Sequence, residues 1–467
     1  MQNYLIKNIQ VVNEGLVQVN DVLIAGGRIE KIAPQISSDV AVEINGEGKF
    51  LLPGAIDDQV HFREPGLTHK ATIGSEAKAA VAGGVTSFME MPNTVPNALT
   101  IELLEDKYKI AAQTSLANYS FFMGTANNNA DEVLRVNELK KDICGVKIFM
   151  GSSTGNMLVD NYVTLNKVFS ESEVLIATHC EDEKIIKRNY EKRITEKPEL
   201  DAADHPIIRD AEACFESSLT AIQFAKKYNS RLHILHISTA KELALFSNML
   251  PLKEKRITAE VCVHHLHFTA DDYAQLGYQI KCNPAIKSPE NKAALWEALL
   301  DDRLDVIATD HAPHTLTEKG YVRNEAGMLV PAPENPGYQH AHSGLPLVQH
   351  SLPLMLHYVK QGRIKLEKVV EKMSHAVADC FQIANRGYIR EGYMADLVIV
   401  DMNAPYTINT GNILYQCGWS PMEGMSLPAS VTHTFVNGNL VYHAPGGDYG
   451  KAVWNESMKG ERLQFDR

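Results

Sequence analysis

The segment Asp57-Asp58-Gln59-Val60-His61-Phe62-Arg63-Glu64-Pro65-Gly66 places an imidazole two residues before a guanidinium, directly after the apolar run 50–56. That short run, marked by proline and glycine, predicts a buried strand. Side chains alternate along an extended chain, so His61 and Arg63 are predicted to point to the same side. A neutral imidazole is a good zinc ligand, and a planar guanidinium matches a carboxylate with two hydrogen bonds. The segment therefore predicts a metal ligand beside a site for an anionic substrate.

Four more apolar runs carry residues that can bind a metal or transfer a proton: His179 follows 174–178, His236 lies in 231–237, Asp310 follows 303–309, and Lys147 lies in 145–149. Taken singly, each has an ordinary explanation. A histidine at a strand end is more often a hydrogen-bonded structural residue, and an aspartate there is commonly a helix N-cap. Together they favour an active site, because barrel enzymes build theirs at the carboxyl ends of the strands.

Lys147 is flanked by Val146, Ile148 and Phe149, which leave its ammonium group little room to reach water. A buried lysine is costly unless it is neutralised or chemically altered. This lysine is therefore predicted to have a chemical role.

A pattern of strand, polar loop and helix repeats from Pro53 to about Arg386. The predicted strands are the run before Asp57 and the runs 85–91, 117–123, 145–149, 174–178, 231–237, 257–263 and 303–309. Helical stretches such as 75–82 and 211–228 supply the crossovers that parallel strands require. Eight such units predict an α/β fold of the (β/α)8 TIM-barrel type.

Strand-rich segments flank the barrel region on both sides. Runs 4–12, 17–24 and 28–32 precede it, and runs 395–401, 431–436 and 439–442 follow it. Asn437-Gly438 is a hairpin signal between the last two. We predict that residues 1–52 and 387–467 together form one small β-sandwich, and that residues 53–386 form the catalytic barrel.

The bulk composition is that of a soluble enzyme. With 467 residues, 45% of them hydrophobic, the chain can bury a large core. A net charge of -12 argues against a nucleic-acid or anionic-membrane surface, so an acidic substrate needs a local cationic pocket. Seven scattered cysteines without a Cys-x-x-Cys pair, and first residues that lack the apolar core of a signal peptide, predict a cytoplasmic protein.

Several of these segments resemble motifs of the dihydroorotases, a group within the amidohydrolase superfamily. The opening segment is similar to the first metal motif of that group, in which His-x-Arg is followed by Glu-Pro-Gly. Met91-Pro92-Asn93-Thr94, Cys282-Asn283-Pro284 and Asp310-His311-Ala312-Pro313-His314 resemble three further motifs. The resemblance covers nearly the whole chain, with specific motifs in the barrel and weak ones at the ends.

The resemblance implies zinc, one or two ions per chain. The implied ligands are His61 and Asp310 on the first metal, His179 and His236 on the second, and Lys147, carboxylated by carbon dioxide, as the bridge. Gln59 stands where the family has its first histidine, and an amide oxygen is a weaker ligand than an imidazole. Either Gln59 coordinates weakly or one metal position is under-liganded.

Two metals about 3.5 to 4 Å apart can share a hydroxide and lower its pKa toward neutrality. In the implied reaction this hydroxide attacks the ring amide, while Asp310 first takes a proton and then passes it to the leaving ring nitrogen. Arg63, Asn93 and His314 would hold the substrate carboxylate, and Asn283 would contact the ring. The implied reaction interconverts dihydroorotate and N-carbamoyl-L-aspartate in pyrimidine synthesis.

Two alternatives remain open. Another cyclic amidase is one, although allantoinases place asparagine where Arg63 stands, and hydantoinases lack both that arginine and the Pro-Asn-Thr signature. The other is a metal-deficient scaffold for a partner such as a transcarbamoylase, for which Gln59 is the only support. Whether the chain forms a homodimer is also open.

Three further segments receive only weak predictions. Gly151–Gly155 is predicted to be a mobile loop, because it lacks the lysine and spacing of a phosphate-binding loop. The histidine-dense stretch 263–267 is predicted to pack near the site. The long irregular stretch 313–342 is predicted to be functional or disordered, and its histidines have no assigned role.

Overall fold

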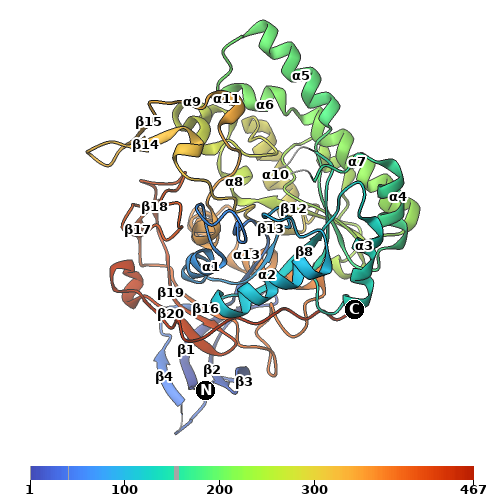
Figure 1. Ribbon diagram of the computed structural model, residues 1–467. Coiled ribbons are helices and arrows are strands. Elements are labelled where there is room, and N and C mark those ends of the chain that lie inside the picture. The colour runs from blue at the N-terminus through green and yellow to red at the C-terminus, as the bar shows by residue number, and fades with distance from the viewer. Residues whose placement is uncertain (1, 40, 152–156) are drawn as a thin grey trace.

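Eight parallel strands form a nearly closed barrel at the centre of the molecule (Figure 1). A computed structural model describes residues 2–39, 41–151 and 157–467, so the predicted loop at 151–155 lies almost wholly outside the described residues. The barrel strands, in spatial order, are β6 (Ala55–Val60), β7 (Val85–Glu90), β8 (Asn118–Gly124), β9 (Gly145–Phe149), β10 (Ile176–His179), β11 (Leu232–Ile234), β12 (Ile257–Cys262) and β13 (Val306–Ala308). The predicted (β/α)8 fold is confirmed.

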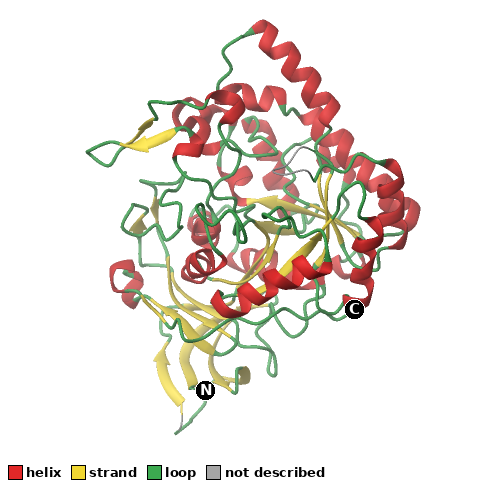
Figure 2. Ribbon diagram, viewed as in Figure 1, coloured by secondary structure: helices red, strands yellow, loops and turns green. Residues whose placement is uncertain are grey.

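Helices surround the barrel and supply most of its crossovers (Figure 2). They are α1 (Ile73–Ala82), α2 (Ile101–Thr114), α3 (Ala130–Leu134), α4 (Tyr162–Glu171), α5 (Glu183–Glu196), α6 (His205–Ile208), α7 (Ala211–Tyr228), α8 (Val263–His267), α9 (Tyr273–Leu276), α10 (Pro289–Leu300), α11 (Gly337–His340), α12 (Ser351–Lys360), α13 (Leu366–Val370) and α14 (Ala376–Phe381). The longer ones start where a polar side chain accepts from a free backbone N–H, as Thr72, Asp182 and Asp210 do. Between β11 and β12 the crossover consists of loops and two short 3-10 helices.

The first barrel strand differs from its prediction. The apolar run 50–56 is divided at Gly54: β5 (Phe50–Pro53) belongs to another sheet, and β6 begins at Ala55 and continues through Gln59. A Cβ on Gly54 would lie 2.0 Å from Thr86 Oγ1, so only glycine allows this close crossing. Asp57, Asp58 and Gln59 are therefore inside the barrel strand rather than after it.

The two ends of the chain share one nine-stranded sheet, seen as blue and red strands side by side in Figure 1. Its strands are β1 (Asn3–Asn13), β2 (Leu16–Ala25), β3 (Arg28–Ala33), β4 (Ala41–Asn45), β5, β16 (Leu397–Asp401), β19 (Ser430–Val436), β20 (Asn439–His443) and β21 (Val453–Trp454). β5 lies between β1, with which it pairs in parallel, and β16, with which it pairs antiparallel.

The stretch 313–342 contains more regular structure than the sequence predicts. It holds α11 and a small hairpin of β14 (Tyr321–Arg323) and β15 (Leu329–Pro331). A second short pair, β17 (Tyr406–Thr407) with β18 (Ser426–Leu427), precedes β19. Among the described residues, no helix combines the length and the apolar character needed to cross a membrane.

A buried ion pair between Arg386 and Asp396 connects the terminal sheet to the barrel. Arg386 donates to Asp396, which also accepts from the Asn118 side chain of β8 at 3.1 Å and from the backbone N–H of Asn437 at 2.8 Å. Both charged residues are only 5% exposed. Removing one partner leaves the other charge buried without compensation.

We therefore expect Asp396→Asn to lower the free energy of unfolding by about 3 kcal/mol, measured by urea denaturation. Asp448→Asn, which affects an exposed pair with Lys451, is the matched control and is expected to change it by less than about 1 kcal/mol. Equal effects of the two variants would contradict this role for the buried pair.

Candidate active site

A cavity of about 660 Å³ opens at the carboxyl ends of the barrel strands. The predicted site residues that line it are Gln59, His61, Arg63, Asn93, His179, His236, Asn283 and Asp310. Lys147 lies inside the barrel and is fully buried, and His314 is 1% exposed. The structure thus brings together side chains from strands that are far apart in the sequence.

Three of the lining residues have left-handed backbone conformations: Arg63 with φ 69°, His236 with φ 40° and Asp310 with φ 48°. Such conformations are costly for residues other than glycine, and they tend to cluster at functional sites. Arg63 follows the end of β6 and is not extended, so its proximity to His61 does not arise from strand alternation as predicted. The left-handed turn aims it into the cavity instead.

His61 and Asp310 form the first group of potential metal ligands. His61 Nδ1 lies 2.7 Å from Asn93 Oδ1, to which it donates, and this leaves the lone pair of Nε2 facing Asp310 Oδ1 at 3.1 Å. Burial lowers the pKa of His61, so its ring is neutral at neutral pH. Two electron-pair donors this close are suited to a shared cation.

Gln59 belongs to the same group. Its Nε2 donates to Asp310 Oδ1 at 3.2 Å, while its Oε1 lies 3.9 Å from Cys262 Sγ. Rotation of the amide by half a turn would exchange the two atoms and direct the oxygen toward Asp310. Gln59 is therefore placed where a weak oxygen ligand could act.

His179 and His236 form the second group. His179 Nδ1 lies 3.0 Å from His236 Nε2, and His179 Nε2 donates to Glu181 Oε2 at 3.0 Å. Arg209 donates to the same carboxylate oxygen. Burial acts to raise the pKa of Glu181, but Arg209 and His179 outweigh it and lower that pKa to about 2. The ionised Glu181 thus fixes the His179 ring with Nδ1 directed at His236.

Lys147 connects the two groups electrostatically. Its Nζ is fully buried and has no hydrogen-bond partner among the described residues. Burial lowers the pKa of Lys147 to about 7, while the negative charge of Asp310 opposes this shift. Burial, then the charge of His179, and then the lysine charge lower the pKa of His236. A buried, uncompensated amine between two sets of ligands is what a carboxylated bridging lysine requires, and the residues present fit a pair of metal ions.

Arg63 supplies the positive charge of the cavity. Its guanidinium donates from Nε to the Pro313 carbonyl oxygen at 3.0 Å, and Nη2 lies 3.0 Å from His314 Nε2. Burial lowers the pKa of Arg63 to about 10, so the group stays charged at neutral pH. His314, which also lies 3.1 Å from Lys70 Nζ, sits behind the arginine and orients it.

Asn283 lines the wall of the cavity near His205, whose Nε2 is 3.0 Å from Asn283 Oδ1. Lys281, Tyr338 and Arg209 line the same wall. Burial, together with the charge of Arg209, lowers the pKa of Lys281 to about 7. This wall is well suited to contact a polar ring.

Comparison with known proteins agrees with this geometry. The pattern that describes the Amidohydrolase family matches residues 50–441. The chain belongs to the amidohydrolase family. It is thus a metal-dependent enzyme that hydrolyses cyclic amides, and it has candidate groups of metal-binding side chains.

Two relatives of this amidohydrolase match over most of their length. A dihydroorotase of Pyrococcus furiosus is 33% identical over 92% of this chain and 89% of its own. A dihydroorotase of Listeria innocua is 32% identical over 94% of this chain and 99% of its own. Among solved structures, the L-hydantoinase of Arthrobacter aurescens superposes with a TM-score of 0.85 at 26% identity, covering 94% of this chain and 96% of its own. The dihydropyrimidinase of Brevibacillus agri superposes with a TM-score of 0.84 at 23% identity over 100% of both chains, which supports the fold.

Several side chains of the amidohydrolase site are not among those predicted from the sequence. Glu181 and Arg209 hold His179, and Glu181 could have been suspected because it lies two residues after that histidine. Asp58, His233 and Glu260 meet fully buried beneath the cavity, where His233 Nε2 lies 3.1 Å from Asp58 Oδ2. No local signal predicts that meeting, because the three residues come from three strands.

Proposed function

We propose that this chain is a dihydroorotase, which reversibly hydrolyses the ring amide of dihydroorotate to N-carbamoyl-L-aspartate in pyrimidine biosynthesis. The observation that carries the proposal is the buried, charged guanidinium of Arg63 beside a set of metal ligands in one cavity. The substrate carries one carboxylate, and a guanidinium binds a carboxylate with paired hydrogen bonds. The dihydroorotase relatives support this choice.

Arg63 fixes the position of the ring by holding its carboxylate. Its own geometry is set by the Pro313 carbonyl oxygen and by His314, so little conformational entropy remains to be lost when substrate binds. Asn283, which lines the same cavity, contacts the ring. The reacting amide is thereby directed toward His61, Asp310, His179 and His236.

When bound, a pair of divalent metals supplies a polarised amide carbonyl and an activated water at neutral pH. We propose zinc, because imidazole nitrogens and carboxylate oxygens suit it. Asp310 accepts a proton from the attacking water and delivers it to the ring nitrogen as the C–N bond breaks. The acyl carbon keeps the hydroxyl of that water as a carboxylic acid, which then releases its proton to solvent and becomes a carboxylate, so the atoms and protons of one water are accounted for.

We further propose that Lys147 is carboxylated. Its neutral amine would add to carbon dioxide, forming an N–C bond and releasing one proton. The resulting carbamate gives two oxygens, one for each group of ligands. Because the pKa of Lys147 is lowered to about 7, the reactive neutral amine predominates above that pH and the unreactive ammonium below it.

Bicarbonate is therefore expected to raise the zinc uptake of metal-free protein, most strongly above pH 7. The measurements are zinc per chain by elemental analysis and a carbamate signal in ¹³C NMR after addition of labelled bicarbonate. Lys147→Gln, which cannot form the carbamate, is the control and is expected to show neither effect. Equal zinc uptake with and without bicarbonate would contradict carboxylation.

The proposed function is tested by assaying the zinc-loaded protein with dihydroorotate, allantoin and hydantoin. We expect turnover of dihydroorotate to exceed that of the other two by at least about 100-fold, because neither of those rings carries a carboxylate for Arg63. Preferred turnover of another ring would replace this function with a related cyclic amidase. A protein that takes up no zinc when zinc is supplied, and that turns over none of the three rings, would favour the scaffold alternative.

We also propose that the enzyme is cytoplasmic. All seven cysteines are free thiols and six of them are buried, as expected in a reducing compartment. The substrate partner would be a small anion, with no nucleic acid or membrane involved.

A further inference from the structure

The first group of metal ligands has one imidazole, that of His61, and lacks the second, because Gln59 occupies the family's other histidine position. Since this inference concerns that same metal centre, it rests on the proposed function. His61 and Asp310 converge at 3.1 Å, and Gln59 offers only an amide. An additional nitrogen or sulfur ligand from another strand would complete the group.

Two of the potential ligands in this structure, Lys147 and His236, have a recognisable property. Lys147 Nζ and His236 Nδ1 are buried nitrogens without a hydrogen-bond partner among the described residues. Buried polar atoms are almost always hydrogen-bonded, so such atoms indicate a missing ligand or ion. His264 has the same property at both ring nitrogens and is only 1% exposed.

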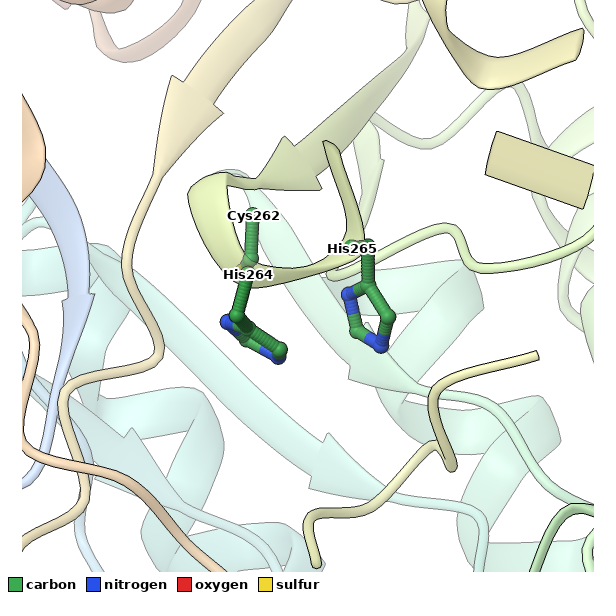
Figure 3. A group of neighbouring side chains, drawn as sticks. All are labelled: Cys262, His264 and His265. Atoms are coloured by element: carbon green, nitrogen blue, oxygen red, sulfur yellow. The ribbon is translucent and has the colours of Figure 1, made fainter. Parts of the chain in front are cut away.

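His264 lies at the correct end of the barrel. It is the second residue of α8, which directly follows β12, and its ring and that of His265 leave this short helix on the same side (Figure 3). The negative charge of Asp310 acts on the His264 ring, and the backbone of Thr309 also approaches it. Burial lowers the pKa of His264 to about 4, so the ring is in the neutral form that binds metals.

The end of β12 also reaches Gln59. Cys262 Sγ is 3.9 Å from Gln59 Oε1 and donates to Glu260 Oε1 at 3.2 Å. Cys262, His264 and His265 can offer ligand atoms that lie within 4.8 Å of one another. Through Cys262, this group therefore reaches the side of the site where the histidine is missing.

The neighbouring side chains are less suitable as ligands. His265 Nε2 is already engaged with the Pro284 carbonyl oxygen at 3.1 Å, and its Nδ1 is the only unpartnered nitrogen of that ring among the described atoms. The Cys262 thiol would have to lose its proton while burial and the nearby carboxylate of Glu260 raise its pKa. His264 needs no loss of a proton, and its contact with the Thr309 backbone leaves one ring nitrogen available for a metal.

We propose that His264 supplies the imidazole ligand of the first metal that Gln59 does not, so that the metal centre draws a ligand from α8, directly after β12, in place of one from β6. Gln59 then lies beside the metal and fills space next to Cys262. The ligand class is a divalent cation of the zinc type. This assignment also explains how an enzyme with Gln59 retains a complete centre.

The test compares His264→Asn with His265→Asn, a matched substitution on the adjacent ring. Each protein is equilibrated with buffered free zinc, and zinc per chain is measured by elemental analysis, with circular dichroism as the check of folding. Loss of a ligand is expected to weaken the first-site affinity by at least about 100-fold, because even supporting residues contribute 10- to 100-fold. His265→Asn is expected to bind zinc as the wild type does.

Gln59→His provides the second variant. In the double variant Gln59→His/His264→Asn, the restored histidine is expected to recover the zinc affinity that His264→Asn loses. Unchanged affinity in His264→Asn, or a loss confined to His265→Asn, would overturn the proposal. So would a failure of Gln59→His to rescue a folded His264→Asn protein.

A crystal structure of the zinc-loaded wild-type protein tests the same point without a variant. We expect a zinc to His264 nitrogen distance of about 2.0 to 2.1 Å. A ring with both nitrogens beyond bonding distance of any zinc would contradict the assignment. Neither readout depends on turnover: zinc bound through His264 without dihydroorotase activity would reject only the proposed function, whereas activity with zinc uptake independent of His264 would reject only this inference.

Discussion

Replacing Asp310 with asparagine is expected to lower the turnover of dihydroorotate by about 1,000-fold. A positioned general acid and base contributes about 10² to 10⁴ in rate, and an amide cannot take the proton from water. Asparagine suits the test because it tolerates the left-handed backbone that Asp310 adopts with φ 48°. The decisive quantity is kcat at saturating substrate.

Metal content must be measured on the same Asp310→Asn sample, because Asp310 also lies 3.1 Å from His61. Asp142→Asn, at a half-buried position shortly before the amino end of β9, is the control and is expected to retain wild-type turnover. If Asp310→Asn with full metal content kept its turnover, another group would have to carry the proton.

Arg63→Lys is expected to lower kcat/KM for dihydroorotate by about 100-fold. A lysine keeps the charge but loses the planar pair of donors that matches a carboxylate, and hydrogen bonds to charged groups contribute about 1.5 to 3 kcal/mol each. The substitution also removes the Nε group, which donates a hydrogen bond to the Pro313 carbonyl oxygen at 3.0 Å. Most of the effect should appear in KM if the contact holds the bound substrate and the transition state equally.

Dihydrouracil, a ring without the carboxylate, gives the control for Arg63→Lys. Its turnover should change little. The preference of the enzyme for dihydroorotate over dihydrouracil should therefore fall by nearly the same factor as kcat/KM for dihydroorotate. Arg28→Lys, at an exposed position on β3 where the guanidinium donates to the Gly392 carbonyl oxygen, controls for the substitution itself. An unchanged preference in Arg63→Lys would mean that the substrate carboxylate is bound elsewhere.

Much of the fold could be predicted because its signals are local. The run 145–149 is a strand with the predicted bounds, and 211–228 is a helix with the predicted bounds. Apolar runs of strand length alternate with helical stretches, and this alternation leaves few other architectures. The hairpin at Asn437-Gly438 was equally local and joins β19 to β20.

The division of the run 50–56 could not be predicted. Both halves are apolar, and which sheet each joins depends on contacts with Thr86 and Asp396, remote in sequence. The same limitation applies to the site. The strand ends could be predicted to carry His179 and His236, but not the backbone conformations that aim Arg63 and Asp310, which depend on tertiary contacts.

The role of Gln59 shows the limitation most clearly. From the sequence it is only a substitution at a ligand position. In the structure it shares Asp310 with His61 and touches Cys262, which belongs to a strand about two hundred residues later. A pattern read along the chain cannot reveal a compensating residue that approaches from across the barrel.

The position of β5 has a consequence for how the protein is made. One edge of β5 can pair with β1 as soon as both strands have been synthesised. The other edge cannot pair until β16, which begins at Leu397, has been synthesised. Throughout synthesis of the barrel, the nascent chain therefore carries an open strand edge on the ribosome. Exposed edges recruit other strands, so chains that stop before Leu397 are expected to aggregate even when their barrel residues are present.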